Sequence, residues 1–407
     1  MRILHSADWH LGRRLYGRSR HDEFDAFLDW LAETIEREQV DVLLVAGDVF
    51  DSSAPPNHAQ SQYYRFLHRV SGGCCRHVVV IGGNHDSPSF LEAPRELLAA
   101  LSVHVVGKAC DDPADEVLLL RDRSGAPALI VCAVPYLRDR DIRTVEAGES
   151  VTDKAQKLVD GIVRHYKAVA DVALRRRREA DRPLPIVGMG HLFAAGGETV
   201  EGDGVRELYV GSLAHVSGAV FPASFDYLAL GHLHKPQRVG GDEVKRYSGS
   251  PLPMGFGEAG QRKAVCLIEF GTGEPVVREL EVPVFRRLAS IEGDWPALAA
   301  AIETLVATGE RVWVEVTYDG AELLSDLRER LAEAVADSAV EILRIRNNRV
   351  VQRVLGRLRE EETLDDLDPH DVFRRCLDAH EVPAPQRAVL EGAYREVVTA
   401  LLEGEQP

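Results

Sequence analysis

The chain lacks the long apolar runs of a membrane protein and the cysteine spacing of a disulfide or zinc framework. No stretch of its 407 residues approaches the roughly 18 consecutive apolar residues of a membrane helix. Residues 1–10 alternate apolar residues with histidine and aspartate rather than forming the apolar core of a secretory signal, so we expect a cytoplasmic protein. None of the six cysteines forms a C-x-x-C pair, which predicts reduced, structural thiols.

Positive charge is also in deficit. The chain has 48 Lys and Arg against 65 Asp and Glu, a net charge of −17. Such a protein does not bind nucleic acid through its overall field, so contact with a polyanion requires a local basic patch or bound cations. This balance weighs against a simple electrostatic DNA-binding module, but not against an enzyme that acts on phosphate esters.

The sequence does contain a regular alternation of apolar strands and amphipathic helices. It predicts strands at 3–6, 42–46, 78–81, 117–120, 128–134, 185–189, 227–230, 244–247 and 264–270, with helices at 24–35, 59–70, 90–101 and 151–179. Alternation of this kind is typical of βαβ units, and it predicts an α/β fold with a largely parallel sheet.

The pattern changes after residue 275. A strand at 312–318, a helix at 321–336 and a strand at 340–345 predict a small α/β domain, and a helical pattern follows from residue 365. We therefore expect three parts, at 1–275, 276–350 and 351–407, the second of a size that folds alone.

Metal-capable side chains follow five of the predicted strands directly. They are Asp8, His10, Asp48, Asn84, His85, Asp86, His191, His232 and His234. Ligands of open α/β sheets bind beyond the carboxyl ends of the strands. A mixed nitrogen and oxygen set without thiolate suits Mn, Fe or Zn. Two such cations about 3.5–4 Å apart clamp the attacking and leaving oxygens of a phosphoryl transfer.

Each motif alone has an ordinary structural explanation. A Gly-Asp pair is more often a turn or helix cap, and His232-x-His234 could equally be a surface pair. Five motifs in succession, each after a strand, instead predict one two-metal site.

These motifs resemble the calcineurin-like metallophosphoesterase superfamily, whose pattern D-x-H, G-D, G-N-H-[D/E], G-H, G-H-x-H occurs intact and in order here. The flanking segments 3–12, 46–51, 82–87 and 247–251 are similar to the SbcD family of bacterial nuclease subunits. The resemblance implies an α+β sandwich of two mixed β-sheets flanked by helices. Residues 276–350 would form a capping, DNA-binding domain, and 351–407 a helical tail that binds a partner.

The resemblance also implies an activity. The implied protein is a Mn-dependent exonuclease and endonuclease that cleaves DNA ends and hairpins. It would work at the nucleoid in DNA repair, recombination and replication. The partner would be SbcC, an ABC-type ATPase with coiled coils. Mg, Fe and Zn are alternative metals. The competing functions are a phosphatase or cyclic-nucleotide phosphodiesterase for small substrates, and a non-catalytic scaffold of a DNA-processing complex.

Site roles follow from the resemblance residue by residue. Asp8, His10 and His234 would hold one metal, Asn84, His191 and His232 the other, and Asp48 would bridge them, with His85 at the scissile phosphate and Asp86 orienting it. Asp51 is a departure, because archaeal relatives have a second phosphate-contacting histidine there. His58 is a candidate replacement, or the role is absent.

Three further sets of residues are predicted to contact partners. The predicted DNA contacts are Arg13, Arg14, Arg18 and Arg20. The alternative is that these arginines are a run of charges that faces solvent. The predicted interface of a homodimer consists of Tyr63, Phe66, Leu67, Phe90, Leu91 and Leu97. The alternative is that this apolar stripe packs in the core of the single chain. The docking site for the ATPase is Phe373, Leu377, Leu390 and Tyr394.

Overall fold

A computed structural model describes residues 1–142, 150–180, 182–194, 220–320, 322, 324 and 326–347, and the single positions 373, 374, 377, 387, 390 and 394. The chain divides into two compact units, Met1–Leu288 and Ala289–Pro407. None of the helices in these described ranges is long and apolar enough to cross a membrane.

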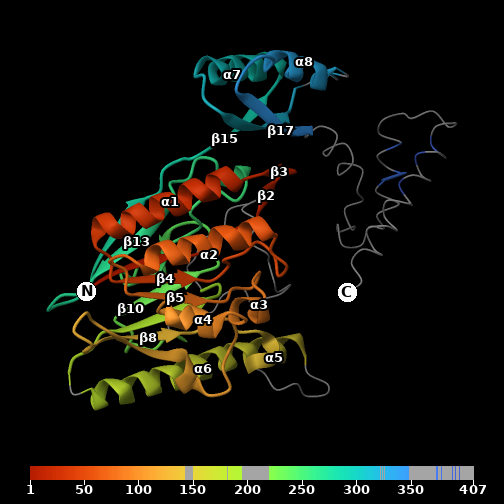
Figure 1. Cartoon of the computed structure of the whole chain (residues 1–407). Coiled ribbons are helices and arrows are strands. Elements are labelled where there is room, and N and C mark those ends of the chain that lie inside the picture. Colours follow the sequence, from red (N-terminus) through yellow and green to blue (C-terminus); the bar gives the residue numbers. More distant parts are fainter. Residues whose placement is uncertain are drawn as a thin grey trace. The chain divides into compact units, whose positions relative to one another are not determined.

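Two six-stranded mixed sheets form the centre of the first unit (Figure 1). The first sheet has the order β14 (Val276–Glu281), β13 (Ala264–Glu269), β1 (Arg2–Ser6), β4 (Val42–Ala46), β5 (His77–Ile81) and β6 (Val103–Val106). The second has the order β11 (Gln237–Arg238), β12 (Lys245–Tyr247), β10 (Tyr227–Gly231), β9 (Ile186–His191), β8 (Pro127–Ala133) and β7 (Val117–Arg121). In the first sheet β1, β4, β5 and β6 are parallel, and in the second β8, β9, β10 and β12 are.

The two sheets face each other across a layer of fully buried side chains. Leu44 and Ile81 of the first sheet belong to one apolar cluster with Leu129 and Val187 of the second. The helices α1 (His21–Glu38) and α2 (Asn57–Ser71) cover the outer face of the first sheet, and α6 (Val151–Glu179) covers that of the second (Figure 1). The central strand β4 is buried on both faces and is therefore continuously apolar. The predicted helix-flanked pair of mixed sheets is confirmed.

The prediction of one continuous helix at 90–101 was wrong. The structure has two short helices, α3 (Pro88–Glu92) and α4 (Arg95–Ala100), with Pro94 between them. Proline has no backbone N–H and its ring clashes with the preceding turn, so a helix does not run through it without a break.

A three-stranded sheet lies in the second unit, apart from the first two residues of its edge strand β15 (Arg287–Gly293). Its order is β15, β16 (Val312–Tyr318) and β17 (Val340–Asn347), and α7 (Trp295–Ala307) and α8 (Leu327–Ala334) belong to the same unit. The division from the first unit falls after Leu288, not after residue 275. The reason is that β14 pairs with β13 along its whole length, so the segment 271–275 is a hairpin turn of the first sheet.

Four of the six residues predicted for a dimer interface are core residues of the single chain. Tyr63, Phe66, Leu67 and Leu91 are buried between α2, α3 and the first sheet. Phe90 is partly buried against the same core, and only Leu97 of the six is exposed, at 71%. A helix stripe that packs on its own sheet is not available to a second copy.

Four described positions of the C-terminal segment are those predicted to dock the ATPase. The rings of Phe373 and Tyr394 stack on each other with centroids 4.0 Å apart. Leu377 is buried, whereas Leu390 is exposed. Phe373 and Tyr394 therefore contact each other within the segment, and Leu390 remains accessible.

Candidate metal centre

The predicted ligands come together at one end of the sandwich, at the carboxyl ends of β1, β4, β5, β9 and β10 and on the loops that follow. Backbone hydrogen bonds continue the β1–β4 pairing beyond the strands: the Asp8 N–H donates to Gly47 O (3.0 Å) and the His10 N–H to Asp48 O (2.9 Å). The backbone N–H of His232 donates to the Asp8 carboxylate at 2.9 Å, which links the second sheet to the first. The scattered motifs therefore form one site.

Four of the candidate ligands have a left-handed backbone. The φ angles are 52° at Asp8, 48° at His10, 49° at Asp48 and 102° at His232. This region is unfavourable for residues other than glycine, by about 1–3 kcal/mol each, and it persists where surrounding contacts impose it. The concentration of such residues at these strand ends indicates that the fold stores strain to direct these side chains inward.

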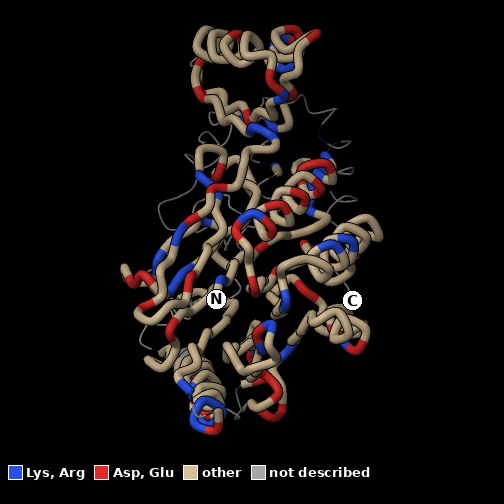
Figure 2. The backbone as a smooth tube through the Cα atoms, turned by 60° about the vertical axis from the view of Figure 1, so that its left-hand side comes forward, with Lys and Arg blue, Asp and Glu red and all other residues tan. Residues whose placement is uncertain are grey.

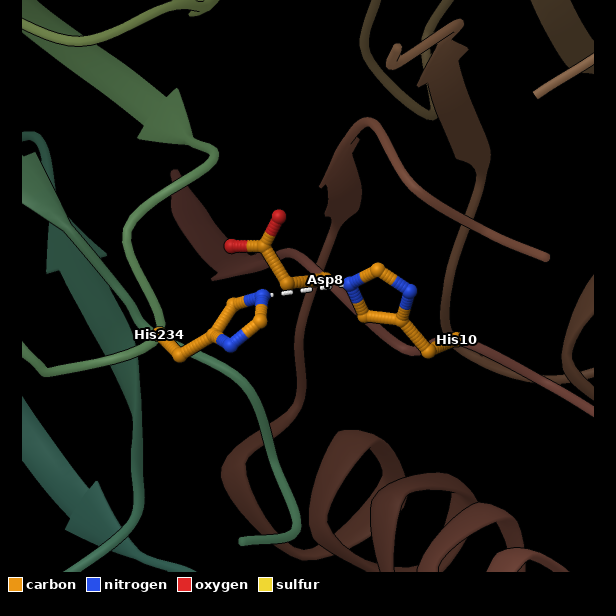
Figure 3. A group of neighbouring side chains, drawn as sticks. All are labelled: Asp8, His10 and His234. Carbon is orange, nitrogen blue, oxygen red and sulfur yellow. Dashed lines mark hydrogen bonds between the residues drawn. The ribbon is translucent and has the colours of Figure 1, made fainter. Parts of the chain in front are cut away.

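Asp8, His10 and His234 form the first group of possible ligands (Figure 3). All three are buried, and the Nε2 atoms of His10 and His234 lie 3.2 Å apart. Burial lowers the pKa of His10 to about 4. Its imidazole is then neutral at physiological pH, the form that binds metal ions.

Asn84, His191 and His232 form the second group. The Asn84 Oδ1 lies 2.9 Å from Nε2 of His191 and 3.0 Å from Nδ1 of His232. The Nδ1–H of His191 donates to the Ala46 carbonyl at 2.9 Å, which directs Nε2 inward. Burial lowers the pKa of His232 to about 3, so this ring is also neutral.

Asp48 stands between the two groups. Its Oδ2 lies 3.7 Å from His10 Nε2 and 3.3 Å from His191 Nε2. Burial opposes charge on both partners of the Asp48–His191 pair, but their mutual attraction prevails, lowering the pKa of Asp48 and raising that of His191 to about 9. Burial raises the pKa of Asp8 to about 7. Such a concentration of buried carboxylate and imidazole fits divalent cations, which would replace the proton on His191.

Two glycines allow the strand ends to approach this closely. A Cβ on Gly83 would lie 2.1 Å from Asp48 Oδ1, and one on Gly231 would lie 1.9 Å from the Ala46 carbonyl oxygen. Any side chain at either position would push the ligand loops apart.

The structure places His85 beside the groups but contradicts the role predicted for Asp86. The Asp86 carboxylate accepts the backbone N–H groups of Val49 (3.1 Å), Phe50 (3.0 Å) and Gly83 (2.9 Å). The His85 Nδ1–H instead donates to the carbonyl of Asp51 at 2.9 Å. Asp86 therefore ties the loop after β4 to the loop after β5, and the Asp51 backbone orients His85.

Asp86→Asn is accordingly expected to lower the stability of the fold. The amide replaces one acceptor oxygen with a donor and leaves at least one buried N–H unsatisfied, so the free energy of unfolding should fall by about 1–3 kcal/mol. Urea unfolding measures this, with Asp25→Asn, an exposed carboxylate paired to Arg65, as the matched control that changes little. A variant of normal stability whose pH–rate profile shifts would instead support the original orienting role.

The neighbours of Asp51 show what this residue does in place of a histidine. Its carboxylate Oδ1 lies 3.3 Å from His10 Nδ1 and accepts from the Arg13 guanidinium at 3.0 Å. His58 stacks on His21, with ring centroids 3.9 Å apart, at the start of α2. Among the described residues, Asp51 therefore supports His10, and His58 packs on α1 rather than entering the site.

Arg13 and Arg20, both predicted to contact DNA, bind carboxylates and backbone carbonyls within the chain. Arg20 is 2% exposed, and it binds the Glu23 carboxylate and the Pro253 carbonyl. Arg13 binds Asp51 and the Met254 carbonyl. Arg14 and Arg18 are exposed on the hairpin of β2 (Arg14–Leu15) and β3 (Arg18–Ser19). The prediction for Arg20 was wrong, because burial and an ion pair remove it from the surface.

Sequence reasoning missed two residues that adjoin the first group. Glu258, at the end of the short helix η3 (Phe256–Glu258), has its Oε1 3.3 Å from His234 Nδ1. The Lys263 ammonium donates to the other carboxylate oxygen of Glu258 and to the His234 carbonyl. Both are buried. The signal available was a few charged residues in a glycine-rich segment, which by itself does not indicate what they contact.

With this geometry established, comparisons with known proteins place the chain. A family model described as calcineurin-like phosphoesterase matches residues 1–236, and the type 5 capsule protein repressor C-terminal domain matches residues 284–381. Residues 237–283, which include Glu258 and Lys263, lie in neither match. The sandwich and its strand-end ligands thus define a calcineurin-like phosphoesterase.

The relatives narrow this class. The chain is 37% identical to the SbcD protein of the nuclease SbcCD from Escherichia coli K12, over 98% of both chains. It is 36% identical to the SbcD protein of Rhodobacter capsulatus, over 85% of this chain and 86% of the relative, and 35% identical to that of Bacillus subtilis, over 67% of each. The chain therefore belongs to the SbcD family of SbcCD nuclease subunits. A dimetal phosphatase structure from Danio rerio, with 13% identity, covers 70% of this chain and 97% of its own, at a TM-score of 0.39 that carries no argument.

Proposed function

We propose that the chain is a metal-dependent DNA nuclease that hydrolyses phosphodiesters at DNA ends and hairpins with two divalent cations, manganese first among them. The observation that carries this is the position of Asp48, whose carboxylate faces His10 of one ligand group and His191 of the other. Full-length similarity to nuclease subunits supports DNA as the substrate rather than a small phosphoester.

The side chains divide into those that hold cations and those that act on substrate. Asp8, His10 and His234 would hold one cation and Asn84, His191 and His232 the other, with Asp48 shared. Bound there, the cations would supply Lewis-acid stabilisation of the phosphate oxygens. The His85 Nδ1 is bonded to the Asp51 carbonyl, which leaves Nε2 to donate a proton to the leaving oxygen. No protein nucleophile is required.

The decisive assay compares substrates. The full chain, freed of metal and then supplied with Mn²⁺, is offered a DNA hairpin, a blunt duplex and an aryl phosphodiester, with and without an SbcC-type ATPase. Cleavage of the DNA substrates supports the nuclease. Turnover of the aryl ester alone would indicate a small-substrate phosphoesterase, and turnover of none would indicate a scaffold.

The hairpin of β2 and β3 is the proposed DNA contact. Figure 2 shows acidic and basic residues interspersed along the chain, so DNA binding has to be local. Arg14 and Arg18 are exposed on this hairpin, and Tyr16, 48% exposed, lies between them. Guanidinium contacts to phosphates are independent of base sequence, as a nuclease acting on DNA ends requires.

Arg14→Ala with Arg18→Ala is expected to weaken DNA binding and to flatten its salt dependence. Each lost phosphate contact lowers the slope of log K against log salt by about 0.9, so the double variant should lose about 2. Fluorescence anisotropy with duplex DNA measures the slope. Arg65→Ala with Arg69→Ala on α2, which removes two other exposed arginines, is the control. An unchanged slope in the hairpin variant would contradict the assignment.

The proposed assembly follows the names of the relatives. As the SbcD member of an SbcCD-type complex, the chain would bind an SbcC-type ATPase through its C-terminal segment, with Leu390 as the exposed apolar contact. A homodimer through α3 and α4 would use Leu97 and the edge of Phe90, since the other predicted residues are core. We propose the cytoplasm and nucleoid as its location.

A further inference from the structure

Two charged pairs stand directly behind the imidazoles of the first ligand group. Glu258 Oε1 lies 3.3 Å from His234 Nδ1, and the Lys263 ammonium donates to Glu258 Oε2. Asp51 Oδ1 lies 3.3 Å from His10 Nδ1, and Arg13 donates to the same oxygen at 3.0 Å. In each pair a carboxylate faces the outer nitrogen of a histidine, and a cation fixes that carboxylate from behind.

The inner nitrogens of the same two rings face each other. The Nε2 atoms of His10 and His234 lie 3.2 Å apart. His10 Nδ1 is buried and makes no hydrogen bond in the described part of the chain, which leaves the Asp51 carboxylate as an acceptor within reach. A proton held on each Nδ1 is the condition for both Nε2 lone pairs to point at one position.

The second group has a weaker support. His191 Nδ1–H donates to the Ala46 carbonyl, a neutral acceptor. His232 turns its Nδ1 toward Asn84, so that its δ nitrogen faces inward. A carboxylate behind a ligating histidine makes the ring a stronger donor than a carbonyl does, because its full negative charge offsets the charge that the ring shares with the metal.

We propose that Glu258 and Asp51 are positioning residues for the first metal site, and that their carboxylates make it the tighter of the two. Glu258 accepts the Nδ1 proton of His234, and Asp51 Oδ1, 3.3 Å from His10 Nδ1, is the carboxylate placed to accept the proton there when a metal fixes the ring, so that both rings present Nε2 to the metal. Lys263 and Arg13 hold the two carboxylates in place. This inference rests on the proposed two-metal function, and it assigns Asp51 a role on the ligand side of the site.

The test is a titration of the metal-free full chain with Mn²⁺, in which equilibrium dialysis and the electron paramagnetic resonance of free Mn²⁺ resolve a tight and a weak site. Glu258→Gln and Asp51→Asn should each weaken the tight site about 10–100-fold, while the weak site keeps its affinity. The matched control is Glu116→Gln, which alters a buried glutamate bonded to His165 at 2.8 Å, away from the ligand groups. It should leave both affinities unchanged.

Glu258→Gln leaves Lys263 buried without its counter-charge, so a second variant combines it with Lys263→Met. This pair keeps an acceptor for His234 while removing both charges, and the same selective loss is expected. Unchanged affinities in the Glu258 and Asp51 variants, or equal losses at both sites, would overturn the inference. Wild-type protein that binds fewer than two Mn²⁺ per chain would instead contradict the proposed function.

Discussion

Asp48→Asn is expected to reduce cleavage of DNA ends and hairpins by at least about a thousandfold. The carboxylate is 2% exposed and faces the inner nitrogens of His10 and His191, so its negative charge is shared by both ligand groups. Its Oδ1 also accepts the backbone N–H of His85 at 2.8 Å. Asparagine matches its size but cannot supply the charge that holds two cations close together.

Two measurements separate this loss from misfolding. Equilibrium dialysis should show fewer Mn²⁺ per chain than the two that the wild type binds, and circular dichroism should show the helix content of the wild type. Asp25→Asn, on the exposed surface of α1, is the control for the same chemical change and should keep full activity. If Asp48→Asn cleaved hairpins at the wild-type rate in Mn²⁺, the two-metal site would be wrong.

The order of elements and the ligand motifs were predictable because both are local signals. An apolar run of only five residues that is followed by Gly-Asp, such as Val42–Ala46, is too short for a buried helix and favours a strand, and the residue after its end lies at the carboxyl end of the sheet. Asp8, Asp48, Asn84, His191 and His232 each follow such a run. Parallel strands bring together those of one sheet, whereas the meeting of the two sets depends on how the two sheets pack.

The surfaces were not predictable in the same way. Tyr63 and Leu67 show the spacing of an amphipathic helix, and that spacing is the same whether the stripe packs on its own sheet or on a second copy. Arg20 is a charge in the sequence, but its burial depends on Glu23 and on the Pro253 carbonyl far along the chain. Solvent exposure is a property of the whole fold.

The residues that support the ligand histidines could not be predicted from the sequence for a related reason. Glu258 supports a histidine 24 positions earlier in the chain, and Asp51 supports His10 through a loop contact between β1 and β4. No strand-end pattern marks either one. Residues that bind through another residue are constrained by distance and not by sequence spacing, so they become visible only when the ligands are already placed.

His85→Gln is expected to separate catalysis from metal binding. His85 lies beside the ligand groups, with its ring centroid 4.8 Å from that of His10, but its Nδ1 is committed to the Asp51 carbonyl. The ring is therefore oriented with Nε2 as the atom that can protonate the leaving oxygen. Glutamine keeps a hydrogen-bond donor of similar length, yet it cannot transfer a proton, so the rate should fall about 10²–10⁴-fold.

The discriminating readout is the leaving group. Hydrolysis of an aryl phosphodiester, whose phenolate leaves without protonation, should lose far less rate in His85→Gln than cleavage of DNA, whose alkoxide needs a proton. Both Mn²⁺ sites should fill as in the wild type. Equal losses on the two substrates would mean that His85 acts by stabilising charge on the phosphate, whereas a loss of bound Mn²⁺ would make it a ligand. The Asp51 carbonyl that holds Nδ1 is a backbone atom, so the orientation of His85 should survive Asp51→Asn, and that variant should retain the difference between substrates.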